Sequence, residues 1–182
     1  MYEKFEDYFK IEIKNNENSN FDEITYFKQK YQGMTFGNGL YRVFNKAAID
    51  KWKQIITEGY PGFENYFEPF AYDWLGRCFA VDIRNGKMGN VLMFEIGTAD
   101  VLEIPCNFMS FHEEEIPHYH DSCLASSFFN EWRIYNTDDL QNDKCVGYKI
   151  PLFLGGTDTV DNLEVSDMEV YWNVCSYYKN RI

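Results

Sequence analysis

The sequence predicts an α+β fold in which helices pack against one mostly antiparallel sheet and the chain begins with a helical N-terminal arm. Strand-like apolar runs in the middle of the chain are separated by connections of hairpin length. On either side of these runs, large apolar residues recur at helical spacing. A doubly wound fold would instead alternate strands with helices, so we expect antiparallel pairing.

The arm is predicted over residues 1–35. Residues 2–10 place three aromatic side chains on one side of a short helix, and the polar run 14–20 is typical of a loop. Residues 21–31 repeat the helical pattern, and Gly33 ends it. The rest of the chain, residues 36–182, is predicted to form one α+β domain, because no linker-like segment separates two cores.

A strand and a helix open this domain. Residues 40–44 are predicted to form a strand, and Asn45 is a suitable N-cap for a helix over 46–58. Gly59 would follow as the C′ residue. Apolar residues at helical spacing give this helix one buried face: Ile49, Trp52 and Ile56.

Four further strands are predicted in the middle of the chain, at residues 69–74, 77–83, 90–96 and 101–104. Asn85-Gly86 supplies the turn between the second and the third, since glycine tolerates the positive φ of tight hairpins. Ser110, with Glu113 three residues later, has the spacing of a capping box.

The last third of the chain combines helices and strands. A helix is predicted over 122–134, with Leu124, Phe128, Phe129 and Trp132 on one buried stripe. Residues 145–154 and 163–165 are predicted strands, and 168–179 form the final element. Apolar residues on both faces of 148–154 predict a strand that is covered on both sides.

The excess of acidic over basic residues indicates which kind of molecule the chain can bind. The chain has 29 acidic and 17 basic residues, a net charge of −12. Direct nucleic-acid binding is therefore not expected, because it depends on lysine and arginine neutralising phosphates. Such a charge favours a basic protein partner and accelerates encounter with it, although many acidic proteins carry such charge for solubility alone.

Acidic residues are concentrated near the C-terminus. Residues 136–170 contain eight acidic residues and two lysines. Our candidate partner-binding residues are taken from this stretch: Asp138, Asp139, Asp158 and Asp161. The same stretch also fits solvated loops between strands.

The cysteines and the N-terminal sequence indicate the cellular compartment of the protein. Five widely spaced cysteines without a CxxC pair indicate reduced, buried thiols. The first residues lack the basic flank and apolar run of a signal peptide, and no apolar stretch approaches the ~20 residues that cross a bilayer. We expect a cytoplasmic protein that does not enter a membrane.

The three histidines are the best metal candidates. His112, His118 and His120 lie among acidic residues, and neutral imidazole with carboxylate suits zinc, nickel or iron. However, the HExxH spacing is absent and Pro117 is expected to interrupt a helix. We predict a polar, pH-responsive surface loop without a metal. A dyad of His120 with Cys123 is also conceivable, but no orienting group is visible.

Several motifs carry a family resemblance. The segments are GYKIPLFLGG at 147–156, DNLEV at 161–165 and DMEVYW at 167–172, together with GLYRV at 39–43 and WLGR at 74–77. They resemble the C-terminal domain of bacterial type VI secretion immunity proteins over about residues 36–178. The first 35 residues correspond at most to a truncated GAD-like region.

The resemblance implies a toxin-antitoxin function. Such a protein would bind and neutralise a cognate secreted toxin, with no enzymatic activity, catalytic residue or cofactor. The acidic charge leads us to expect a basic nuclease as the toxin. The alternative is a metal-binding or small-molecule-binding regulatory module centred on His112, His118 and His120. The oligomeric state stays open.

Overall fold

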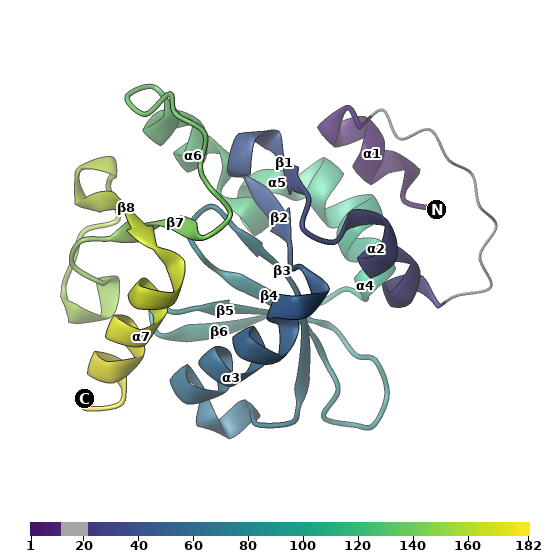
Figure 1. Ribbon diagram of the computed structural model, residues 1–182, viewed down its shortest axis with the longest axis horizontal. Coiled ribbons are helices and arrows are strands. Elements are labelled where there is room, and N and C mark those ends of the chain that lie inside the picture. Colours follow the sequence, from purple (N-terminus) through teal and green to yellow (C-terminus); the bar gives the residue numbers. More distant parts are fainter. Residues whose placement is uncertain (12–21) are drawn as a thin grey trace.

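The computed structural model describes residues 1–11 and 22–182 and confirms the α+β class (Figure 1). Six strands form an antiparallel sheet in the order of the sequence, and two later strands form a separate antiparallel ribbon. The loop predicted at 14–20 lies outside the described residues. The division into a 1–35 arm and a 36–182 domain stays a prediction.

The elements have the following bounds. The large sheet consists of β1 (Thr35–Phe36), β2 (Tyr41–Val43), β3 (Phe67–Asp73), β4 (Cys78–Asp82), β5 (Val91–Glu95) and β6 (Asp100–Ile104), and the ribbon consists of β7 (Lys144–Tyr148) and β8 (Leu163–Asp167). The helices are α1 (Glu3–Phe9), α2 (Glu23–Tyr31), α3 (Ile49–Gly59), α4 (Phe108–Ser110), α5 (Ile116–Leu124), α6 (Ser126–Arg133) and α7 (Met168–Lys179).

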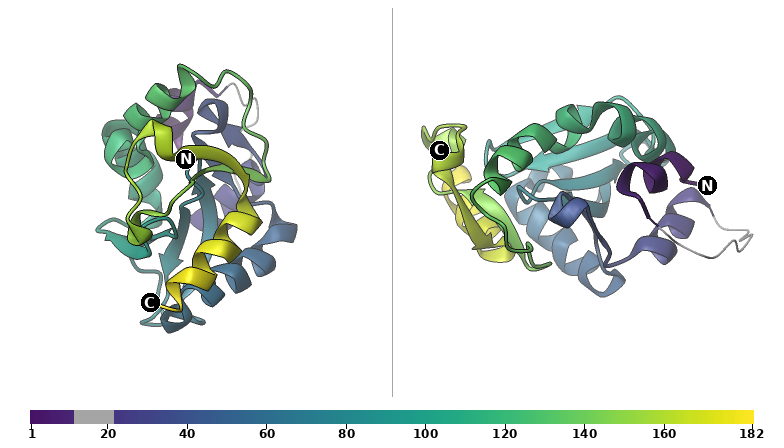
Figure 2. Two further views of the ribbon diagram at one scale, coloured as in Figure 1. Left: turned by 90° about the vertical axis from the view of Figure 1, so that its left-hand side faces the viewer. Right: turned by 90° about the horizontal axis from the view of Figure 1, so that it is seen from above.

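Both faces of the large sheet are covered. Phe79 and Val81 of β4 pack into one hydrophobic cluster, with α1, α2, α5 and α6, whereas Cys78 and Ala80 pack into another, with α3 and α7. Figure 2 shows the sheet between these helical layers. Because alternate residues point to opposite faces, β4 and β5 are apolar at nearly every position.

The two N-terminal helices pack into the main core. Tyr2 and Phe5 from the start of the chain and Phe27 and Tyr31 of α2 are fully buried. Their rings meet mainly edge to face, the arrangement that aromatic quadrupoles favour. At the N-terminal end of α1, the carboxylate of Glu113 accepts the backbone N–H of Phe5 at 3.3 Å.

The segment around the histidines is helical, so the predicted surface loop is wrong. A π-helical turn, Phe111–Glu115, joins α4 to α5. Pro117 sits in the first turn of α5, where a missing backbone N–H is tolerated. The cap is Asn107, which accepts the N–H of Ser110 at 2.8 Å, and the predicted capping box is wrong.

The predicted helix over 122–134 is interrupted at one residue. Ala125 has φ 49° and separates α5 from α6. The expected stripe is largely correct, because Leu124, Phe129 and Trp132 are buried.

The covered strand predicted at 148–154 is also wrong. Strand β7 ends at Tyr148, and Leu152–Leu154 form a 3-10 turn. Ile150 is 55% exposed and Leu154 is 41% exposed. The apolar run is therefore partly displayed at the surface.

The cysteines behave as predicted, since all five are buried and free. Burial raises the pKa of Cys106, Cys123 and Cys175 to about 12, which keeps these thiols protonated and unreactive. Within residues 1–11 and 22–182, no helix is long and apolar enough to cross a membrane.

Candidate functional site

The C-terminal lobe, which we define as residues 134–182, carries most of the large apolar side chains that are exposed among the described residues. It forms the end of the molecule opposite the N-terminus (Figures 1 and 2). Ten large apolar side chains are exposed in it: Ile134, Tyr135, Ile150, Leu154, Val165, Val170, Val174, Tyr177, Tyr178 and Ile182. Exposed apolar groups that gather on one part of a surface, especially with aromatic residues, are typical of interfaces.

A buried arginine fixes the lobe to the sheet. Arg42 of β2 is fully buried and donates to the backbone oxygens of Gln141 at 3.0 Å and Lys144 at 2.6 Å. It also donates to the backbone oxygen of Asp73 at 2.9 Å, and its guanidinium lies 4.4 Å from the Tyr72 ring centre. Desolvation lowers the Arg42 pKa, but these acceptors and the ring compensate for much of its burial. The start of β7 is thereby held against β2.

The WLGR motif at residues 74–77 is hydrogen-bonded to the lobe and to the neighbouring helix α5. The indole N–H of Trp172 in α7 donates to the backbone oxygen of Gly76 at 2.8 Å, and that of Trp74 donates to Leu124 at 3.0 Å. Arg77 pairs with the fully buried carboxylate of Asp73 at 2.6 Å. The family motifs thus contact one another inside the molecule and serve as its frame.

One asparagine shapes the loop between β7 and β8, residues 149–162. Asn162, which is 8% exposed, accepts the N–H of Ile150 at 3.0 Å and donates to the oxygens of Ile150 and Thr157, both at 2.8 Å. A Cβ on Gly156 would lie 1.8 Å from the Ile150 oxygen, so a side chain cannot fit there. This frame explains why Ile150 and Leu154 are held outside the core.

A hollow of about 450 Å³ lies beside β8, and we call it the β8 hollow. Tyr135, which is 78% exposed, and Val165, which is 53% exposed, supply apolar surface. Asp138 and Asp139 supply carboxylates. Arg133 donates to the backbone oxygens of Thr137 and Asp138, which orders the loop that carries these acids.

The other two predicted acids lie elsewhere in the lobe. Asp158 lines a separate hollow of about 420 Å³ and accepts the Tyr148 hydroxyl at 2.8 Å. Burial raises the pKa of Glu95 in this hollow, and nearby Arg77 opposes the rise. Asp161 contributes its backbone oxygen to Lys149. The structure therefore brings Asp138 and Asp139 together but separates them from Asp158 and Asp161.

The histidines do not converge. His112 is fully buried, with Nε2 2.9 Å from the Tyr41 hydroxyl and Nδ1 2.9 Å from the Phe108 oxygen. His118 lies 3.4 Å from a Glu114 oxygen on the surface. Among the described residues, no group of three or more metal-ligating side chains could hold an ion.

The possible dyad is not formed either. The His120 Nδ1 lies 2.6 Å from the Ser126 hydroxyl, whereas the Cys123 thiol contacts the Glu115 backbone oxygen at 3.7 Å. The raised thiol pKa disfavours the thiolate that nucleophilic chemistry requires.

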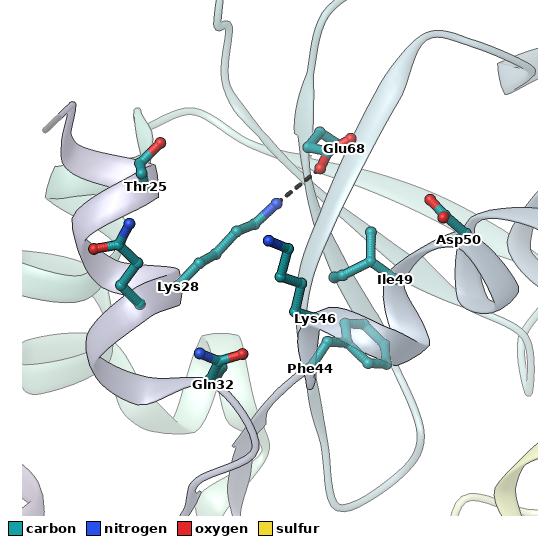
Figure 3. Close-up of a pocket in the computed structure, with 9 residues that line it drawn as sticks. Thr25, Lys28, Gln32, Phe44, Lys46, Ile49, Asp50 and Glu68 are labelled. Atoms are coloured by element: carbon teal, nitrogen blue, oxygen red, sulfur yellow. Dashed lines mark hydrogen bonds and ion pairs between the residues drawn. The ribbon is translucent and has the colours of Figure 1, made fainter.

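A further hollow, of about 350 Å³, lies between α2 and α3 (Figure 3). Lys28 pairs with Glu68 at 2.8 Å in this hollow, and the neighbouring Lys53 lies 3.6 Å from the same carboxylate. None of the predicted site residues lines it. Lys46 and Asp50 also line the hollow, so its lining carries two basic and two acidic residues and no excess of either charge.

Sequence reasoning missed the apolar members of the β8 hollow. Tyr135 followed a predicted helix, and Val165 was assigned to a strand without a face. Local alternation gave no signal for it, since Val165 lies between Glu164 and Ser166 and would be expected on the covered face, whereas it is 53% exposed.

Comparison with known proteins agrees with this description. Residues 110–177 match the family described as T6SS immunity protein Tdi1, C-terminal. The resemblance to type VI secretion immunity proteins is thus confirmed over these residues, and the similarity expected over 36–109 stays a prediction. Such immunity proteins are typically not enzymes, as we expected.

The fold has a solved counterpart. It is similar to the crystal structure of Atu4351 from Agrobacterium tumefaciens, with a TM-score of 0.60 and 16% sequence identity. The similarity covers 97% of this chain and 88% of the other, and it shows a shared fold. No curated protein matches the chain.

Proposed function

We propose that this chain is a bacterial immunity protein that binds a cognate secreted toxin through its C-terminal lobe and thereby neutralises it. The observation that carries the proposal is the β8 hollow, where exposed Tyr135 and Val165 lie beside Asp138 and Asp139, all within the matched residues 110–177. An apolar centre with charged neighbours is the usual anatomy of a protein interface.

The charge of the lobe supports a basic toxin. Residues 136–170 carry eight acidic residues and two lysines. Nucleases carry positive charge where they bind phosphates, so an acidic surface would attract them and could cover that surface. A nuclease is the toxin class that we propose. We also propose the cytoplasm as the location, where buried free thiols stay reduced.

Co-expression tests the function directly. The gene adjacent to this one would be expressed in a host with and without this chain, followed by measurement of survival and of complex formation. We expect protection and a stable complex. Equal killing in both cultures without a complex would contradict the immunity function for that pair.

A pair of tyrosine variants tests the surface. Tyr135→Ala removes the most exposed aromatic side chain of the β8 hollow, and Tyr66→Ala removes one that is 47% exposed outside the lobe. We expect the first variant to weaken toxin binding about tenfold or more, as interface aromatic residues often do, and the second to leave it unchanged. Equal affinities would place the interface elsewhere.

A further inference from the structure

The β7–β8 ribbon has one free edge, and the hydrogen bonds at its ends show which residues face it. At the end where β7 leads into the loop, the Lys149 N–H donates to the Asn162 oxygen at 2.7 Å, and at the opposite end the Met168 N–H donates to the Asp143 oxygen at 2.9 Å. Hydrogen-bonded and non-hydrogen-bonded pairs alternate along an antiparallel ladder. Even-numbered residues of β8 therefore face β7, and odd-numbered residues point their backbone groups away.

Val165 is the exposed odd-numbered residue. Its N–H and C=O point away from β7, and the N–H of half-buried Asp167 does the same. In the described part of the chain, β8 pairs with no strand other than β7, and no hydrogen bond uses these three groups. An exposed strand edge is a ready template for pairing with another chain.

The β8 hollow lies next to this edge. Val165 belongs to both, because its side chain lines the hollow and its backbone forms the edge. A strand added to β8 would place alternate side chains on the same side as Val165, above Tyr135 and the carboxylates of Asp138 and Asp139. Backbone bonds supply affinity in this mode of recognition, and the adjoining pocket supplies specificity.

We propose that the toxin docks a short extended segment on the edge of β8 at Val165 and inserts a basic side chain from it into the β8 hollow. This inference rests on the proposed immunity function. The positive charge follows from complementarity with Asp138 and Asp139, neither of which has an ion-pair partner among the described residues. Like charges facing them would be repelled.

Amide hydrogen exchange tests this edge without mutating the chain. It would be measured on the free chain and on its complex with a catalytically inactive product of the adjacent gene. The Val165 and Asp167 amides should exchange fast in the free protein and at least about tenfold more slowly in the complex, because docking gives them acceptors. The Glu164 and Ser166 amides already face β7 and serve as internal controls.

A proline variant provides the second measurement. Val165→Pro removes the outward N–H, and an edge strand tolerates proline at such a position. Val165→Ala is the matched control, since it removes most of the side chain and retains the N–H. We expect the proline variant to bind the inactive toxin at least about tenfold more weakly than the alanine variant, at equal thermal stability.

The outcomes separate the two proposals. A complex that leaves Val165 exchange unchanged overturns edge docking and leaves the immunity function standing, and so does equal binding by the folded proline and alanine variants. If the proline variant does not fold, hydrogen exchange of the unmodified chain decides. Failure to form any complex overturns the immunity function for that pair, and edge docking with it.

Discussion

Aromatic residues serve opposite purposes at the two ends of this molecule. Near the N-terminus, Tyr2, Phe5 and Phe27 are fully buried, whereas in the C-terminal lobe Tyr135 and Tyr177 are more than half exposed. Both regions are rich in rings, so composition alone does not distinguish them. The difference indicates that the N-terminal rings stabilise the fold, whereas the exposed rings of the lobe, unlike its buried Trp172, are available to a partner.

The hollows of the two regions differ in the same way. The hollow between α2 and α3 contains Lys28 and Glu68, which pair with each other at 2.8 Å. The β8 hollow contains Asp138 and Asp139, whose side chains have no ion-pair partner in the described residues. The first hollow is also lined by Lys46 and Asp50, so its acidic and basic residues balance. In contrast, Lys144 of the β8 hollow pairs with Asp143 and Asp167 and not with Asp138 or Asp139. The two volumes are similar, about 350 and 450 Å³, and the excess of acidic residues makes the β8 hollow the surface suited to a basic partner.

The largest effect on stability is expected in the N-terminal core. Phe27→Ala removes a fully buried ring that lies 4.0 Å from the His112 ring, centre to centre, and should lower the free energy of unfolding by roughly 3–5 kcal/mol. Tyr177→Ala in the lobe should change it by less than about 0.5 kcal/mol. Urea denaturation of both variants measures the contrast, and equal losses would abolish the distinction between the regions.

The pH dependence of stability should also be set by the N-terminal core. Burial lowers the pKa of His112 from its ordinary 6.5 to about 3. As the pH falls below 6.5, the unfolded chain binds a proton there before the folded chain does, so stability is lost progressively down to pH 3. Between pH 6.5 and 4.5 this residue should contribute a loss of about 2 kcal/mol.

Denaturation of two histidine variants isolates this contribution from that of the carboxylates. His112→Gln should show a smaller loss on acidification than the unmodified chain, whereas His118→Gln, at an exposed position, should show the same loss. Identical pH profiles for all three proteins would show that His112 is accessible to protons in the folded state.

Within the lobe, the hydrogen bonds of Asn162 should matter more for stability than the exposed residues do. Asn162→Ala leaves the N–H and oxygen of Ile150 and the oxygen of Thr157 without a partner, and should cost about 1–3 kcal/mol. Asn173→Ala, at an exposed position of α7, is the control and should be close to neutral. Thermal melts compare the two, and no loss in the first would mean that water replaces the asparagine.

The smallest effect on stability is expected at the displayed acids. Asp138→Lys with Asp139→Lys should change the free energy of unfolding by less than about 0.5 kcal/mol, yet slow association with the toxin and flatten its salt dependence. Asp7→Lys with Glu64→Lys changes the net charge equally at exposed positions outside the lobe. Stopped-flow association that is slowed equally by both pairs would indicate overall charge instead of a local site.

Much of the architecture follows from local patterns. The strands from β2 to β6 lie within two residues of their predicted positions, because each strand of the large sheet pairs with the next and the connections after β3 are short. The segment at 111–121 was predicted to be a loop because it contains Pro117. In the structure, Pro117 lies in the first turn of α5, which follows a π-helical turn. Such a turn has no simple sequence signature.

The candidate site was less accessible to prediction. Asp138 and Asp139 were selected by charge, but Tyr135 and Val165 could not be, since their exposure depends on how the ribbon lies on the sheet. The apolar run at 148–154 suggested a covered strand, whereas the bonds from Asn162, up to twelve residues away, direct it outward. Interactions across such separations are not visible in a local pattern.

The contact of Tyr171 with Gly147 bears on how such a protein can diversify. A Cβ on Gly147 would lie 2.6 Å from the Tyr171 ring, so the ribbon and α7 fit together only while residue 147 lacks a side chain. The residues that face outward, such as Tyr135 and Val165, take no part in this fit. Under the proposed immunity function, the displayed residues can therefore change one at a time as the toxin changes, while the contact between ribbon and helix is kept.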